Sequence, residues 1–484
     1  MSGVSELDSR DHGPMKRLSS MFTSLQEKLS RDRDGRESAA TSSPTSAPPA
    51  LDQTHSSSQF FFEYLVVVSL RRRKLEGSYE PQIIYQFPKQ TDMCHSQREE
   101  EEKSLKAITL FCFPEGVDWA PLTEYHSETF SFVLTEIDGS RRNGYCRRLL
   151  PHGKGARPPE AYCIISQVAC FGLFSKIFDE VEKRRQKSMA MIYPFMQSLR
   201  EAPFPAPGDT VKIKSFIPES GTEIISLTRP CDSWLEHVDF STLFGCLSDQ
   251  EVLHVFASAV MERRIIFSAD ELSTLSQVLH AVAALLNPFT WQHTFISIVP
   301  TVLMDVVMAP TPYLLGVQRN MLDHVVDQSD MLIVDLSAKA KDRFMTSIGD
   351  EGSILPEKLQ QDLLEALAAR TQSSTPEDFN TVVSEAFVSF FIKTVGHVSN
   401  HIHRSRAGRP GVFQKKSFCK AVESKAYQPF VKDFIKTQMF DLFIQELEKQ
   451  PATNEGFFYK RVSEYQEKKR KEKAKSGWVR GFQL

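Results

Sequence analysis

The segment 264–299 constrains the fold most, because it reads as a strand, a helix and a second strand in direct succession. RIIFS at 264–268 and TFISIV at 294–299 are short apolar runs typical of buried strands. Between them, leucine and valine recur at helical spacing until Asn287-Pro288 ends the helix. Two strands joined by such a helix form a βαβ unit with a parallel sheet. We therefore predict an α/β domain over 225–358.

Two Ser-x-x-Glu patterns mark expected helix starts in this domain. Ser248 with Glu251, and Ser268 with Glu271, both have the spacing of a capping box. Further along, Pro310 and Pro312 precede the strand-like run YLLGV, and Gly316 within that run allows another backbone to approach closely. We expect this run to be scaffold.

An α+β domain over 58–203 is predicted before the α/β domain, from strand-like runs followed by a helix. The expected strands are 60–70, 81–88, 107–116, 129–139, 143–151 and 161–170, and the expected helix is 172–185. The Pro- and Gly-rich stretch 202–221 is expected to be a linker.

After the α/β domain, residues 360–451 predict an all-helical domain. One helix starts at Thr375-Pro376 and carries an aromatic stripe, and a second spans Phe430 to Leu447. Residues 1–57 read as a disordered arm with an amphipathic helix over 15–29, and 452–484 as a basic tail that could touch anionic lipid or aid solubility.

Composition and charge exclude several classes of protein. The 58 Lys and Arg against 61 Asp and Glu give a net charge of −3, which argues against a nucleic-acid-binding protein. The eight cysteines form no CxxC pair, as suits a reducing compartment. The N-terminus has no apolar core of a signal peptide, and no run of about 18 apolar residues occurs. We expect a cytoplasmic protein whose membrane contact, if any, is peripheral.

No catalytic, metal or cofactor site emerges from the motifs. P-loop, GxSxG and HExxH patterns are absent. His397, His401 and His403 are spaced as in a metal site, but histidines satisfied near a helix end explain them better. Arg141 and Arg142 sit at a predicted hairpin tip and could act on a phosphate, or could simply be solvated. The residues alone favour a protein that works by binding other proteins.

At the level of motifs, the chain resembles the tripartite DENN domain family, and its type-two branch in particular. The resemblance covers about 60–451 and is carried by these residues: Glu262-Arg263-Arg264, Pro288-Phe289-x-Trp291, Pro300, Ala309-Pro310, Pro312-Tyr313 and Gly316-Val317. It implies a longin-like α+β module, a central α/β module with a mainly parallel sheet, and an all-helical module. The family more often has Tyr at Asn287 and an aromatic at Asn143.

What the resemblance implies about function is guanine nucleotide exchange on Rab GTPases. A family member binds a GDP-bound Rab, opens its nucleotide site and holds the nucleotide-free form until GTP enters. The type-two branch implies a late-endosomal, Rab-nine-class substrate and recruitment to endosomal membranes. Two alternatives stay open: a Rab GTPase-activating protein that uses Arg141, Arg142 or Arg147, and an adaptor that binds Rab without catalysis.

Candidate Rab contacts lie in two places. Four are polar residues of the hairpin, Glu136, Asp138, Arg141 and Arg142, and three follow the YLLGV strand, namely Gln318, Arg319 and Asn320. No catalytic residue, metal or cofactor is expected.

Overall fold

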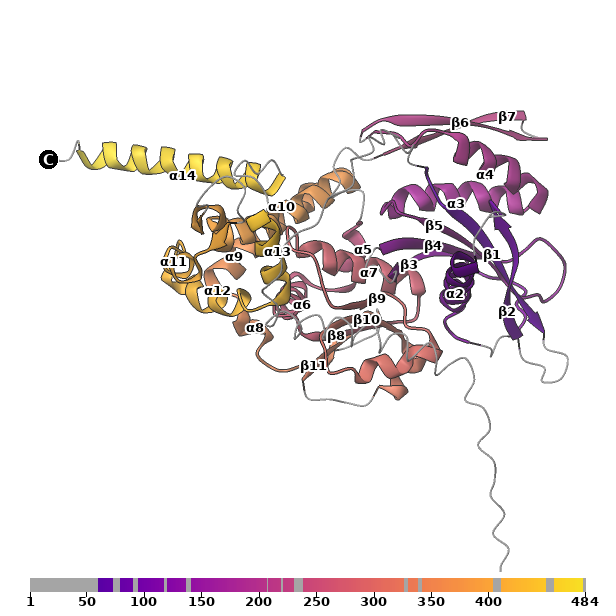
Figure 1. Cartoon of the computed structure of the whole chain (residues 1–484), viewed down its shortest axis with the longest axis horizontal. Helices are drawn as coiled ribbons and strands as arrows, with labels where there is room; N and C mark the ends of the chain where they lie inside the picture. Colours follow the sequence, from indigo (N-terminus) through magenta and orange to yellow (C-terminus); the bar gives the residue numbers. More distant parts are fainter. Residues whose placement is uncertain are drawn as a thin grey trace, which may run out of the picture.

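Three parts follow one another along the chain in the computed structural model (Figure 1). The structure describes residues 60–72, 79–89, 95–116, 120–135, 141–206, 208–218, 221–229, 238–325, 330–337, 342–403, 411–449 and 457–481. The predicted arm 1–57 and its amphipathic helix 15–29 lie outside the described residues.

The first part is built on a five-stranded antiparallel sheet in the order β2-β1-β5-β4-β3. Its strands are β1 (Tyr64–Arg72), β2 (Tyr79–Phe87), β3 (Glu128–Thr135), β4 (Arg141–Leu149) and β5 (Glu160–Ser166). Its helices are α2 (His95–Cys112), α3 (Phe171–Arg185) and α4 (Ile192–Glu201). Alternate residues of β1 feed two different cores: Val66 packs in the cluster that contains α2, and Val67 in the cluster that contains α3 and α4. The sheet is therefore covered on both faces, as an α+β module requires.

The strand predicted at 107–116 is wrong, because most of this run belongs to helix α2. Ile, Leu and Phe in close succession favour a strand by intrinsic propensity. However, Ile108, Phe111 and Cys112 are buried while Lys106 is exposed, which is helical spacing on one face. Tertiary packing decides the conformation here.

The linker predicted at 202–221 is also wrong in its second half. Strand β6 (Thr210–Ile217) pairs antiparallel with β7 (Gly221–Thr228) as a two-stranded hairpin. Its alternation of buried and exposed residues is a strand pattern that the flanking prolines and glycines conceal.

The central part is a five-stranded sheet in the order β12-β11-β8-β10-β9, and the predicted βαβ unit is confirmed. Strands β8 (Arg264–Ala269), β9 (Thr294–Ile296), β10 (Tyr313–Gln318) and β11 (Met331–Asp335) are parallel, and β12 (Phe344–Thr346) is antiparallel. Its helices are α5 (Ser241–Cys246), α6 (Asp249–Val260) and α7 (Leu272–Leu285).

Only one of the two predicted capping boxes forms. Ser248 and Glu251 cap α6 reciprocally, as predicted. Ser268 does not cap α7, because it is buried inside β8, and α7 begins after Glu271 without a side-chain cap. The close approach predicted at Gly316 is confirmed: a Cβ there would lie 2.0 Å from the carbonyl oxygen of Ser297.

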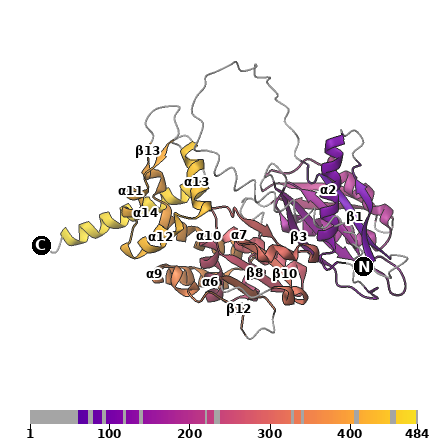
Figure 2. The same ribbon diagram turned by 60° about the horizontal axis from the view of Figure 1, so that its bottom comes forward.

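The third part is helical. It comprises α8 (Glu351–Ile354), α9 (Glu357–Ala368), α10 (Pro376–Val395), α11 (Lys415–Lys420), α12 (Gln428–Phe434), α13 (Gln438–Lys449), α14 (Phe457–Gly481) and the short ribbon β13 (Ile402–His403) with β14 (Val412–Phe413). Thr375 is the N-cap of α10 and Pro376 is the first residue of the helix, as predicted. The single helix predicted from Phe430 to Leu447 is two helices, α12 and α13. Helix α14 projects from the body in both views (Figures 1 and 2).

Within the described residues, one helical stretch, Pro376–His401, is long and apolar enough to cross a membrane. No such stretch was expected from the sequence. Its Phe387 and Phe391 are buried and meet the ring of Phe256 in α6, at centroid distances of 4.7 and 5.8 Å. These contacts place the helix in the core of the protein.

Candidate functional site

The edge strand β3 of the first sheet lies against helix α7 of the central part, and this seam is where two of the three modules meet (Figure 1). The Ser297 hydroxyl donates a 2.7 Å hydrogen bond to the carbonyl of Ser131 in β3. The Glu128 carboxylate accepts a 3.1 Å bond from the amide of Ser273 at the N-terminus of α7, where negative charge is favoured. Apolar side chains of both modules form one continuous buried cluster. The seam is thus both packed and hydrogen-bonded.

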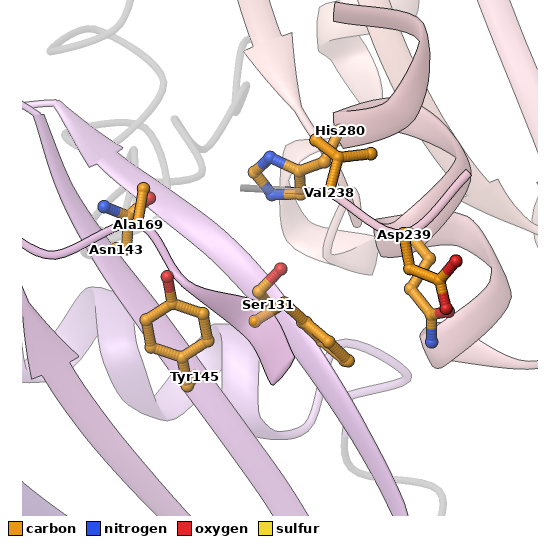
Figure 3. A pocket seen from close by; sticks show the side chains of 9 residues that line it. Ser131, Asn143, Tyr145, Ala169, Val238, Asp239 and His280 are labelled. Carbon is orange, nitrogen blue, oxygen red and sulfur yellow. The ribbon is translucent and has the colours of Figure 1, made fainter. Parts of the chain in front are cut away.

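A small polar cavity opens along the seam (Figure 3). Tyr145 and Asn143 face it from β4, and His280 faces it from α7. Its volume of about 40 Å³ is enough for a water molecule or two, whereas sites for small ligands are roughly ten times larger. The Tyr145 hydroxyl is already engaged, since it donates to the Val168 carbonyl at 3.0 Å and accepts from the Cys170 amide at 2.8 Å. This cavity cannot hold a nucleotide.

The arginines at the hairpin are held by the protein itself. Arg142 pairs with Glu63 at 2.9 Å, and Arg141 donates to the carbonyl of Trp291 across the seam at 3.2 Å. Arg147 is buried and forms ion pairs with Asp179 at 2.6 Å and Glu182 at 3.2 Å. Glu136 and Asp138, the other two hairpin candidates, lie outside the described residues.

The second candidate group lies at the carboxyl end of β10. Gln318 is buried and reaches Glu115 at 3.4 Å. Arg319 pairs with Asp335 at 3.2 Å, and Asn320 is exposed. Ligands of parallel sheets usually bind at this edge, which keeps these positions as contact candidates.

The structure does not bring the two candidate groups together. Gln318 shares Glu115 with Arg148, whose guanidinium makes two bonds of 2.7 and 2.8 Å to that carboxylate. Arg141 and Arg148 both lie on β4, seven residues or about 24 Å apart. The hairpin group therefore marks one end of the seam and the Gln318 group the other.

Arg148 was not singled out in the sequence, although it ties the first module to the loop that reaches the second. It is 1% exposed, donates to the Cys112 carbonyl at 2.7 Å and lies over the ring of Phe113 at 5.0 Å. Burial alone would lower the pKa of this guanidinium, but Glu115, Tyr125 and Cys146 together raise it. The signal in the sequence was an arginine pair inside a strand flanked by Cys146 and Leu149.

Glu262 is a second residue whose role the sequence did not reveal. Its carboxylate accepts hydrogen bonds from the amides of Gln438 and Met439 at the start of α13, both 2.8 Å long, and lies 3.2 Å from Nε2 of His293. Burial raises the pKa of Glu262. The hydrogen bonds from His293 and the two amides lower it by more than burial raises it, so the net shift is downward. Glu262 thereby joins the central module to the helical one.

Phe289, in the motif Pro288-Phe289-x-Trp291, makes a second contact between the central module and the helical module. The ring of Phe289 meets those of Phe391, Phe434 and Phe443 at centroid distances of 4.9, 4.9 and 4.7 Å. This motif residue therefore holds the helical module in place and does no chemistry of its own.

The histidines and cysteines pack as structural side chains. His397 stacks on Phe418 at 4.3 Å, His401 meets the Ser417 hydroxyl at 3.0 Å, and burial lowers the pKa of both imidazoles. Cys112 and Cys146 lie 3.8 Å apart in the core, where burial raises the pKa of each thiol. Across the described ranges, no three His, Cys, Asp or Glu side chains gather as metal ligands.

Comparison with known proteins finds three family models in succession. They are the uDENN domain at 81–149, the DENN (AEX-3) domain at 157–339 and the dDENN domain at 413–461. The second begins just before β5 and ends before β12, so it includes a central strand of the first sheet and the four parallel strands of the central sheet. Family-model boundaries and sheet boundaries therefore differ.

Several DENN domain proteins are similar over most of the chain. DENN domain-containing protein 2D of Mus musculus is 54% identical over 459 residues, which cover 93% of this chain and 97% of that protein. The Homo sapiens protein of the same name is 57% identical over 425 residues, 87% of this chain and 89% of that protein. DENN domain-containing protein 2B of Homo sapiens is 49% identical over 418 residues, 84% of this chain but 36% of that longer protein.

Proposed function

The chain belongs to the DENN domain family, whose members regulate Rab GTPases, and from this premise we propose that it is a guanine nucleotide exchange factor for a Rab. Its substrate is a GDP-bound Rab of the Rab-nine class, which it holds nucleotide-free until GTP enters. It acts from the cytoplasm on endosomal membranes, to which it is recruited peripherally.

The observation that carries this proposal is the seam between the first sheet and the central module. An exchange factor does no covalent chemistry, because it needs only to bind one conformer of its GTPase better than another. A broad surface held rigid by two docked modules serves that purpose. Polar side chains of the seam, Ser297 and Glu128, bond to backbone groups of the opposite module, and the cavity at the seam is too small for a nucleotide.

The contacts of the arginines favour exchange over GTPase activation. An activating arginine must be free to reach a phosphate. Arg142 and Arg147 are already paired with carboxylates, and Arg147 is also buried. Arg141 is exposed but anchored to the Trp291 carbonyl.

The experiment is release of fluorescent GDP from a panel of purified Rabs that includes the Rab-nine class, with excess GTP and with or without the chain. Acceleration on one or a few Rabs is the expected result. Stable binding without acceleration would instead assign the adaptor function. The variant Arg141→Ala should leave GTP hydrolysis by the Rab unchanged, whereas loss of accelerated hydrolysis would assign an activating protein.

A further inference from the structure

The β6–β7 hairpin is packed on one face only. Ile213, Ile217 and Leu227 are buried on its inner face, and Ile213 and Leu227 belong to the cluster that contains α3 and α4. Arg184 of α3 reaches the Ser215 hydroxyl at 3.3 Å, and Lys183 pairs with Glu223 at 2.9 Å. The inner face is therefore fully engaged, and the hairpin is held firmly on the body of the protein.

The outer face carries large apolar side chains in the open. Phe216 is 65% exposed and Ile224 is 61% exposed, the two highest values among the large exposed apolar residues of the described ranges. Lys214 pairs with Ile224 across the hairpin. Lys212 lies two residues before Lys214 on the same face of the strand. The remaining outer positions are Thr222, Ser226 and Thr228, with Thr210 at the far end. The described outer face thus combines apolar and positive side chains and has no carboxylate.

The apolar and charged side chains are ordered along the ribbon. Phe216 is the outer-face apolar residue nearest the turn, Ile224 and Lys214 lie opposite each other one pair further along, and Lys212 lies one pair beyond them. An apolar tip with apolar and positive side chains together behind it matches the boundary of a lipid bilayer, where apolar side chains enter between headgroups and cations meet phosphates. We propose that the outer face of the β6–β7 hairpin binds the surface of an anionic membrane.

Charge argues for a membrane over a second copy of the chain. A two-fold pairing of this face would place the lysines of one copy near those of the other, with no carboxylate among the described residues of the face to balance them. An anionic lipid surface complements the two exposed lysines of the hairpin. The inference does not depend on exchange activity.

The test is sedimentation of the full chain with vesicles of phosphatidylcholine that do or do not contain phosphatidylserine. We expect binding to the anionic vesicles and little to the neutral ones. The double variant Lys212→Glu/Lys214→Glu should bind roughly fivefold more weakly for each lysine lost. Phe216→Ser/Ile224→Ser should also weaken binding to anionic vesicles. All four positions are exposed, so thermal unfolding should stay as in the wild type.

A matched control is Lys415→Glu/Lys416→Glu on α11, which makes the same charge change at exposed positions of another module. It should bind vesicles nearly as the wild type does. Equal binding by the hairpin variants and this control would overturn the proposal. So would a wild-type dimer in sedimentation velocity that the hairpin variants dissociate, since that result assigns the face to a second copy.

A second probe places the contact directly. In the variant Phe216→Trp, the added tryptophan emission should shift to the blue with anionic vesicles and be quenched by brominated lipid, relative to wild type. Unchanged emission would overturn the proposal even if the chain sediments with vesicles. Neither assay contains a GTPase, so the membrane-binding result can be interpreted even if the exchange proposal fails.

Discussion

Glu262 has a positive φ of 53°, in the left-handed region that a glutamate seldom occupies. In this conformation the turn after α6 directs the Glu262 carboxylate toward the first backbone amides of α13. Two backbone donors and His293 then share one partly buried carboxylate. The family motif Glu262-Arg263-Arg264 is structural by the same logic, since Arg263 pairs with Asp350 and Arg264 with Asp330.

Replacing Glu262 should loosen the helical module. We expect Glu262→Ala to lower the free energy of unfolding by about 1–3 kcal/mol, because two helix-terminal amides and His293 lose their acceptor. The folded pKa lies below the unfolded one, so the contribution is complete above the usual glutamate pKa and is lost as pH falls through the folded value. Urea unfolding at neutral and acidic pH measures both effects. An unfolding free energy in Glu262→Ala that depends on acidic pH as steeply as in the wild type would contradict this account.

Gly316 is constrained by packing, because another backbone segment lies directly against it. A methyl group there meets the Ser297 carbonyl, which is backbone and cannot rotate away. Gly316→Ala should therefore destabilise by about 1–3 kcal/mol or more. Gly172→Ala in α3, where an added Cβ has nothing within 4 Å, is the control and should be neutral or slightly stabilising. Thermal unfolding of the pair checks it, and equal melting temperatures would refute the close-approach argument.

At the scale of elements, the same Ser-x-x-Glu pattern forms a helix cap at Ser248 but not at Ser268. Ser248 accepts a bond from the Glu251 amide, while Ser268 sits in β8 with a buried hydroxyl. Ser248→Ala should lower the unfolding free energy by about 1 kcal/mol, and Ser268→Ala should change it little or raise it. Chemical denaturation of both variants is the measurement. A larger loss for Ser268→Ala would mean that its hydroxyl has a stabilising role that its geometry does not reveal.

The elements that the sequence predicted well are those whose periodicity and end signals agree. The parallel βαβ unit, α3, α6 and α10 all combine an apolar face with a clear start or stop. Helix α2 was misread because β-favouring residues lie on a helix face, and β6 because prolines surround it. Both depend on what packs against them, which no local window contains.

The candidate site was less predictable than the fold for a related reason. Arg141, Arg142 and Gln318 are polar residues that the sequence suggests as Rab contacts, yet each bonds to a residue distant in sequence. The contact of Arg141 with the Trp291 carbonyl exists only once the modules dock. Sequence patterns identify side-chain types, whereas the geometry of the seam sets which of them are free to meet a partner.

At the scale of the whole molecule, the seam makes the first and central modules one body with a candidate contact group at each end. A Rab that touches both groups would have to extend along β4 from Arg141 toward Arg148, which lies about 24 Å further along that strand. Exchange would then depend on the rigidity of the seam as well as on the contact residues. This dependence separates a surface that only recruits a Rab from one that reshapes it.

The Ser297 hydroxyl allows that dependence to be tested, because it bonds across the seam while a matched serine bonds within one helix. Ser297→Ala removes the 2.7 Å bond to the Ser131 carbonyl, and Ser276→Ala removes the 3.1 Å bond to the Ser273 carbonyl inside α7. Each should cost about 1 kcal/mol of unfolding free energy. Only Ser297→Ala should speed hydrogen exchange in β3 and slow GDP release from the Rab, with Rab binding largely retained. If both variants slow GDP release equally, stability alone is responsible and the seam has no special part in exchange.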